Sequence, residues 1–177
     1  MRFELSTDSR VFVDLRAAGL LKAVGHDATL SARPEAATID PDDGRVVVKF
    51  PVRAIEPPPN MPEPDQQKMM DNLRGGDVLD AKRFPVVELR AHYEGTVDGG
   101  ELRGELLVRG QPRLIAMTVS TTRQWDILVA TGVWEGTLGE LGIKPFKALW
   151  GALRLEDWIR LRLEARFRCE AIDGGTA

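Results

Sequence analysis

The sequence is poor in the residues that build covalent and metal-based sites. It has one cysteine, Cys169, and two histidines, His26 and His92. A single cysteine excludes an intramolecular disulfide, and cysteine-based zinc or iron–sulfur sites need several thiolates. Two histidines are too few for a histidine-rich metal site. The sequence therefore predicts no metal and no cofactor.

Long apolar runs and a large charge excess are absent as well. No stretch approaches the ~18 consecutive apolar residues that span a bilayer, and Met1–Asp8 lacks the apolar region of a secretion signal. If Met1 is the native start, we expect a cytoplasmic protein; a trimmed start would leave a periplasmic location. The 24 basic and 27 acidic side chains give a net charge of −3, so the field that attracts nucleic acid is missing. We expect neither a nucleic-acid partner nor a transmembrane segment.

Motifs of the common enzyme classes are also missing. The sequence has no phosphate-binding loop of the P-loop or dinucleotide type and no nucleophile elbow. The one polar cluster is Gly25-His26-Asp27. Adjacent residues point in different directions, so Asp27 is poorly placed to orient His26, and a turn in which Asp27 caps a backbone N–H is the favoured interpretation. His26 stays a candidate for a turn residue or for contact with a polar head group, and we predict no catalytic residue.

What the sequence has is a strong period of two between many turns. Its 177 residues, with 43% hydrophobic side chains, fit a single domain over 1–177. The cleanest strand runs from Trp158 to Cys169. Apolar residues from Ile159 to Phe167 alternate there with Arg160, Arg162, Glu164, Arg166 and Arg168. Such alternation indicates one face in water and one face in an apolar interior.

Two segments break this period and predict short helical insertions at about 62–74 and 143–153. In the first, Asp65 is the candidate N-cap, and Met69, Met70 and Leu73 form the buried stripe. In the second, Pro145 lies near the start and apolar residues recur at helical spacing. We expect this second helix to pack at a barrel mouth as a lid, with Phe146, Leu149, Trp150 and Leu153 facing inward. The four tryptophans, Trp125, Trp134, Trp150 and Trp158, are interpreted as core residues.

The sequence predicts seven to nine antiparallel strands, and their apolar faces indicate a mainly β protein, either a closed barrel or a sandwich. The one-sided alternation favours the barrel, because closure removes the sheet edges and leaves one apolar lumen. Three stretches then resemble the YceI family. They are a strand ending in a histidine turn (19–27), the helix and its following Phe-Pro strand (71–89), and a Gly-x-Leu hairpin (104–113). The resemblance implies a single extended lipocalin-like antiparallel β-barrel. It also implies a lumen that in relatives holds a polyisoprenoid or quinone-like chain.

The function expected from these observations is non-enzymatic binding and carriage of a long apolar ligand, such as a prenyl or acyl chain, in the lumen. Each buried methylene contributes about 0.8 kcal/mol, so a long chain needs few polar contacts. Two alternatives stay open: a barrel with a filled core whose Trp134–Trp158 region binds a partner or a second copy as a homodimer, and an enzyme based on His26. The predicted ligand-binding residues are Val13, Leu15, Phe50, Leu89, Leu106, Met117, Trp134, Phe146, Trp150, Leu153, Leu161 and Leu163.

Overall fold

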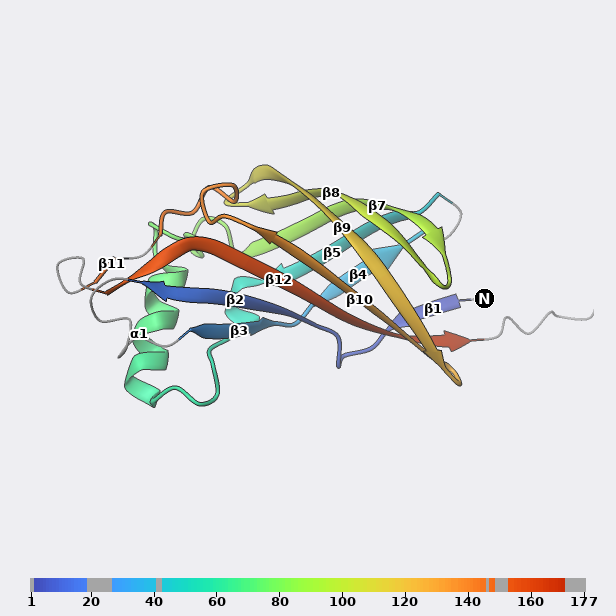
Figure 1. Cartoon of the computed structure of the whole chain (residues 1–177), viewed down its shortest axis with the longest axis horizontal. Helices are drawn as coiled ribbons and strands as arrows, with labels where there is room; N and C mark the ends of the chain where they lie inside the picture. The colour runs from blue at the N-terminus through green and yellow to red at the C-terminus, as the bar shows by residue number, and fades with distance from the viewer. Residues whose placement is uncertain (1, 19–26, 41–42, 146, 149–152, 171–177) are drawn as a thin grey trace, which may run out of the picture.

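The computed structural model describes residues 2–18, 27–40, 43–145, 147–148 and 153–170. These residues form one antiparallel sheet with a single α-helix, α1 (Glu63–Arg74), at one end of it (Figure 1). The remaining elements are β1 (Arg2–Leu5), β2 (Arg10–Ala18), β3 (Ala28–Ala32), β4 (Ala36–Ile39), β5 (Arg45–Pro51), the 3-10 turn η1 (Val52–Ala54), β6 (Ile55–Glu56), β7 (Val86–Thr96), β8 (Gly99–Val108), β9 (Gln111–Gln124), β10 (Ile127–Gly136), β11 (Lys147–Ala148) and β12 (Leu153–Glu170).

The sheet is curled into a barrel. Its strand order is β4-β5-β7-β8-β9-β10-β12-β2-β3-β6, and β1 and β11 both pair with β12. The chain itself joins the two ends of this order, because β3 continues through 33–35 into β4, and β5 continues through η1 into β6. On one side of that interruption Ser31 pairs with Glu56, and on the other Ala36 pairs with Lys49. The expected extended, lipocalin-like antiparallel barrel is confirmed.

The two-residue alternation along the strands separates side chains that face the barrel interior from side chains that face solvent. Strand β12 lies between β10 and β2, with Leu161 opposite Trp134 on one side and Val13 on the other. Its apolar set is buried or half-buried, and its charged set faces solvent. Phe12 breaks the alternation of β2 by pointing outward, where the Arg162 guanidinium covers its ring at 5.0 Å. Cation–π contact therefore replaces burial in the lumen for this ring.

The first predicted helix is confirmed as α1, with one correction at its start. The N-cap is Pro62, whose carbonyl accepts hydrogen bonds from the backbone N–H groups of Asp65 and Gln66 at 3.0 Å each. Asp65 therefore lies in the first turn, where its carboxylate favours the positive end of the helix dipole. Met70 is buried, and Met69 and Leu73 pack beside it as predicted. The helix ends at Gly75.

The second predicted helix, over 143–153, was wrong wherever the structure describes that segment. Lys147–Ala148 form β11 and pair with Arg154 and Leu153, and Leu153 already begins β12. Apolar residues at helical spacing also arise in a chain that crosses a barrel end and turns back as a strand, so the spacing did not determine the structure. The lid was predicted on Phe146, Leu149, Trp150 and Leu153. The first three lie outside the described residues, and Leu153 begins β12 instead of lying in a helix.

Three clusters of buried side chains divide the interior. One gathers around Leu102, Met117 and Phe167 on the longest strands. A second joins α1 to Leu15, Leu138 and Leu141, and a small third one surrounds Val52. Leu106 is half-buried and packs against all three clusters. The side chain of Leu106 therefore lies where the three clusters meet. In the described part of the chain, no helix is long and apolar enough to cross a membrane.

Candidate functional site

The barrel encloses a cavity of about 1590 Å³ that runs along its length. At one end, here called the helix end, the wall includes Met69 and Leu73 of α1; at the other, here called the hairpin end, it includes Thr96 and Val97 of the β7–β8 turn. Exposed residues belong to the wall at both ends, Lys68 at the helix end and Val97 at the hairpin end. The cavity therefore reaches the surface at both ends. Its volume exceeds the 300–1,000 Å³ or so of a pocket for a drug-sized ligand.

Most of the residues predicted from strand alternation lie in this cavity wall. They come from six different strands, because successive inward positions on neighbouring strands face a common lumen. Their burial ranges from half-buried to nearly complete. The predicted residues in the wall are Val13, Leu15, Phe50, Leu89, Leu106, Met117, Leu161 and Leu163.

The other predicted residues lie elsewhere or outside the described residues. Trp134 is half-buried and packs against two of the core clusters without lining the cavity. Phe146, Trp150 and His26 fall outside the described residues, as does the side chain of Leu153. Asp27, which follows His26, accepts a hydrogen bond from the backbone N–H of Ala17 at 3.1 Å. Asp27 therefore caps a backbone N–H of the preceding strand β2, rather than the local N–H of the turn that the sequence predicted.

Sequence reasoning missed two groups of wall residues. Ala28, Leu30 and Ala32 of β3 are buried and line the cavity. Their alternation with Thr29 and Ser31 was a usable signal. Leu138 and Leu141 are only 4% and 3% exposed and also line the cavity. They belong to an irregular connection between β10 and β11, where no period could have pointed to them.

Polar side chains in the wall are concentrated toward its two ends. Asp65, Lys68 and Arg154 lie at the helix end, and Asp43 and His92 lie at the hairpin end. Both groups are exposed. The wall between them is apolar, so a bound molecule would meet hydrocarbon along the barrel and charge only near the rims. This arrangement suits a long apolar chain with a small polar group.

Tyr93 is a half-buried polar residue close to the hairpin end of the wall. Its hydroxyl donates a hydrogen bond to the carbonyl of Thr96 at 2.7 Å. Burial raises the pKa of Tyr93, and the nearby Asp98 carboxylate raises it further. The phenol therefore stays neutral at physiological pH and holds the β7–β8 turn.

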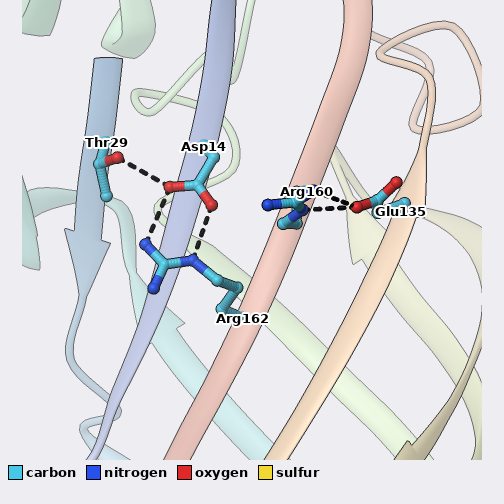
Figure 2. A network of polar contacts seen from close by, with 5 residues as sticks. All are labelled: Asp14, Thr29, Glu135, Arg160 and Arg162. Atoms are coloured by element: carbon cyan, nitrogen blue, oxygen red, sulfur yellow. Dashed lines mark hydrogen bonds and ion pairs between the residues drawn. The ribbon is translucent and has the colours of Figure 1, made fainter. Parts of the chain in front are cut away.

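The outer wall is held by ion pairs between β2, β3, β10 and β12 (Figure 2). The Arg162 guanidinium donates two hydrogen bonds to the Asp14 carboxylate, at 2.7 and 2.9 Å, and Thr29 donates a third at 2.7 Å. Hydrogen bonding to Arg162 lowers the pKa of Asp14 despite the opposing effect of burial, and Thr29 lowers it further. Arg160 pairs with Glu135. The arginines of β12 are thus largely neutralised by carboxylates, unlike a stripe that binds nucleic acid.

The described residues contain no metal-binding cluster. Among them, no three His, Cys, Asp or Glu side chains come together in a way that could hold a metal ion. The enzyme alternative depends on His26, which lies outside them. What the described residues do build is a hydrocarbon-lined channel with polar rims.

No protein-family model and no curated protein matches this sequence. Solved structures do match it. BcnA of Burkholderia cenocepacia has a TM-score of 0.65 at 14% identity, covering 92% of this chain and 99% of BcnA. The YceI protein of Campylobacter jejuni has a TM-score of 0.55 at 15% identity, covering 80% of this chain and 82% of its own. A variant of the latter with a monobromobimane guest gives 0.56 at 14% identity, with the same coverage. The chain therefore shares the fold of the YceI protein structures.

Proposed function

We propose that this YceI-like barrel binds and carries one long apolar molecule, a polyisoprenoid, quinone or lipid chain, without covalent chemistry. The observation that carries the proposal is the cavity of about 1590 Å³ with an apolar wall along the barrel. A barrel with a filled core, the alternative expected from the sequence, would leave no room of this size. Because the inward side chains leave this cavity between them, the carrier is favoured over the barrel with a filled core.

The energetics of such binding need no specific polar anchor. About ten methylene groups leaving water contribute about 8 kcal/mol at ~0.8 kcal/mol each. Association costs about 4–15 kcal/mol in lost freedom, depending on the treatment. A short acyl chain therefore binds weakly, and a chain of several prenyl units binds well. Affinity that rises with chain length is the signature we expect.

Native mass spectrometry of protein purified from its own host tests the proposal first. We expect a co-purifying apolar mass that organic solvent extracts. Protein stripped of this mass should then bind prenyl alcohols with an affinity that increases with chain length. The absence of both a co-purifying mass and prenyl-alcohol binding would overturn the proposal.

A matched pair of variants tests whether binding occurs in the lumen. Leu106 packs against all three core clusters and lines the cavity, while the neighbouring Glu105 on the same strand is exposed. Leu106→Trp should narrow the channel and reduce prenyl-alcohol affinity at least about tenfold, or about 1.4 kcal/mol. Glu105→Trp adds the same ring outside and should leave affinity unchanged. Equal affinities in the two variants would place the ligand outside the lumen.

A further inference from the structure

The β9–β10 hairpin projects beyond its neighbour at the hairpin end of the barrel. Strand β8 begins at Gly99, which pairs with Ser120 of β9, whereas β9 continues to Gln124. The Thr121 hydroxyl donates a hydrogen bond to the Val97 carbonyl, so the β7–β8 turn ends against the base of this projection. Figure 1 shows the β9–β10 hairpin at the end where β1 lies, away from α1. Trp125 forms its tip.

The placement of Trp125 is unfavourable in two ways for a residue with only a structural role. Its side chain is 96% exposed, the largest value among the exposed large hydrophobic residues of the described chain. Its backbone adopts φ +57°, a left-handed conformation that bulky residues rarely adopt. Strain retained at an exposed position points to a function rather than to folding. The sequence interpretation of Trp125 as a core residue was wrong.

The mouth of the cavity lies at the base of this hairpin projection. Thr96 and Val97 of the β7–β8 turn and Thr121 of β9 belong to the cavity wall, and Val97 is itself 58% exposed. An apolar channel therefore opens where two exposed apolar side chains project. A long apolar ligand resides in a membrane or a micelle. To reach this mouth through water, the ligand would first have to leave that apolar environment.

We propose that Trp125 inserts into the interfacial layer of a phospholipid bilayer and holds the hairpin-end mouth of the lumen against it. Tryptophan concentrates at this layer because its ring is large and apolar but carries one N–H donor. Arg123, whose Nε donates to the Trp125 carbonyl at 3.3 Å, holds the tip and carries a charge that suits lipid phosphates. The delivery of ligand through this contact rests on the proposed function; the contact itself does not.

A bilayer fits this tip better than a protein partner does. Stable protein interfaces bury about 1,200–2,000 Å² in total, whereas one tryptophan supplies about 150–250 Å². Trp125 and Val97 are the only large hydrophobic residues more than half exposed at the hairpin end of the described chain. A bilayer needs no shape complementarity. With a net charge of −3, the chain has no reason to prefer anionic lipids, so neutral phosphatidylcholine is the appropriate probe.

Co-sedimentation of the full chain with phosphatidylcholine vesicles tests the contact. We expect the wild type to partition measurably and Trp125→Ala to partition at least about tenfold less, because most of an indole surface no longer leaves water. Leu114→Ala is the matched control: Leu114 is 82% exposed near the opposite end of β9, and its loss should change nothing. Brominated phosphatidylcholine should quench tryptophan fluorescence in the wild type but not in Trp125→Phe.

Several results would overturn the contact. They are the absence of wild-type partitioning, equal partitioning of wild type and Trp125→Ala, and an equal loss in Leu114→Ala. Sedimentation velocity without vesicles adds another: an oligomer that Trp125→Ala dissociates would assign the tip to a second copy of the chain. Prenyl-alcohol binding in vesicle-free solution separates the two proposals, since Trp125→Ala should bind as well as wild type. Partitioning without such binding would reject the carrier and keep the membrane contact.

Discussion

The two ends of the barrel are built differently although the same strands connect them. At the helix end, α1 contributes the buried Met70, and the irregular connection after β10 contributes Leu138 and Leu141 to the same cluster. At the hairpin end, the described chain contains only turns and strand ends, and Val97 and Trp125 are exposed. Among the described residues, a helix packs one end of the barrel and no helix packs the other.

This difference shows what strands alone cannot do. A sheet with one apolar face makes a wall, but covering the end of the barrel needs a segment with another period, such as the 3.6-residue repeat that buries Met70. The turns of the hairpin end supply no such face, since their large apolar side chains, Val97 and Trp125, are exposed rather than packed over the barrel end. We infer that stability is concentrated at the helix end and ligand exchange at the hairpin end. The predictions below test that division.

The largest effect is expected from Met70→Ala at the helix end. Met70 is 4% exposed and belongs to the cluster that joins α1 to the sheet. Removing its side chain leaves a hole in packed surroundings, and buried Met→Ala changes cost about 2–5 kcal/mol. Chemical denaturation measures the loss directly.

The adjacent methionine is the control for that change. Met69 is half-buried and lines the cavity. Its truncation enlarges a space that already exists, so we expect a loss of under about 1 kcal/mol in the unliganded protein. If Met69→Ala destabilises as much as Met70→Ala, the helix end is packed through to the axis, and the cavity does not extend under α1.

A smaller effect is expected from Ser9→Ala, at the hairpin end. Ser9 is 2% exposed, and its hydroxyl accepts the backbone N–H of Arg166 at 3.0 Å and donates to the Arg166 carbonyl at 3.3 Å. The hydroxyl thus continues the pairing of β12 where β1 has ended. Alanine leaves a buried donor unpaired, which costs about 1–3 kcal/mol.

Ser6→Ala is the comparison for this change, because the Ser6 hydroxyl only accepts the exposed N–H of Asp8 at 3.3 Å. We expect Ser6→Ala to have almost no effect on the denaturation midpoint. Hydrogen exchange at the amide of Arg166 should accelerate in Ser9→Ala alone. Unchanged protection there would mean that the wall at this end does not depend on the Ser9 hydroxyl.

How far the sequence predicted these features depended on whether a period was present. Strict alternation placed Leu161 and Leu163 inside and Arg160 and Arg162 outside β12, because neighbouring strand residues face opposite sides. The helical repeat placed α1. In 143–153, by contrast, the apolar residues recur at helical spacing, but the described positions of that segment form no helix. In Gln124-Trp125-Asp126 the left-handed position is held by tryptophan rather than by glycine, asparagine or aspartate, so the sequence did not predict a left-handed residue at Trp125.

A change in the wall that connects the two ends should have a moderate, pH-dependent effect. Asp14→Asn removes the carboxylate that Arg162 and Thr29 hold, and we expect a loss of about 1 kcal/mol at neutral pH, because the Arg162 side chain is 41% exposed and screened by solvent. The pKa of Asp14 is lowered in the folded state, mainly by hydrogen bonding to Arg162. The stabilisation is therefore present above the unfolded pKa of about 3.9 and disappears as the pH falls through the lower folded value.

Urea denaturation of wild type and Asp14→Asn across this range checks the sign. The two stabilities should differ most above about pH 5 and converge toward pH 3. A difference that stays constant down to pH 3 would show that the substitution acts through packing rather than through the charge of Asp14. The vesicle partitioning of Asp14→Asn should match that of the wild type, because the ion pair lies on the barrel wall away from the hairpin tip.

The smallest effect on stability, and the sharpest test of the division between the ends, is Trp125→Gly. Glycine adopts φ +57° without steric cost, so relieving the strain at the tip should stabilise the fold by about 0.5–1 kcal/mol after the greater chain entropy of glycine is counted. The same change removes the indole and should abolish most vesicle partitioning. A rise in the midpoint of urea denaturation together with a fall in partitioning would show that the strained tryptophan is kept for contact at the expense of stability. If Trp125→Gly instead lowers the midpoint of urea denaturation, the indole stabilises the hairpin itself. The proposed division, with stability at the helix end and contact at the hairpin end, would then be wrong.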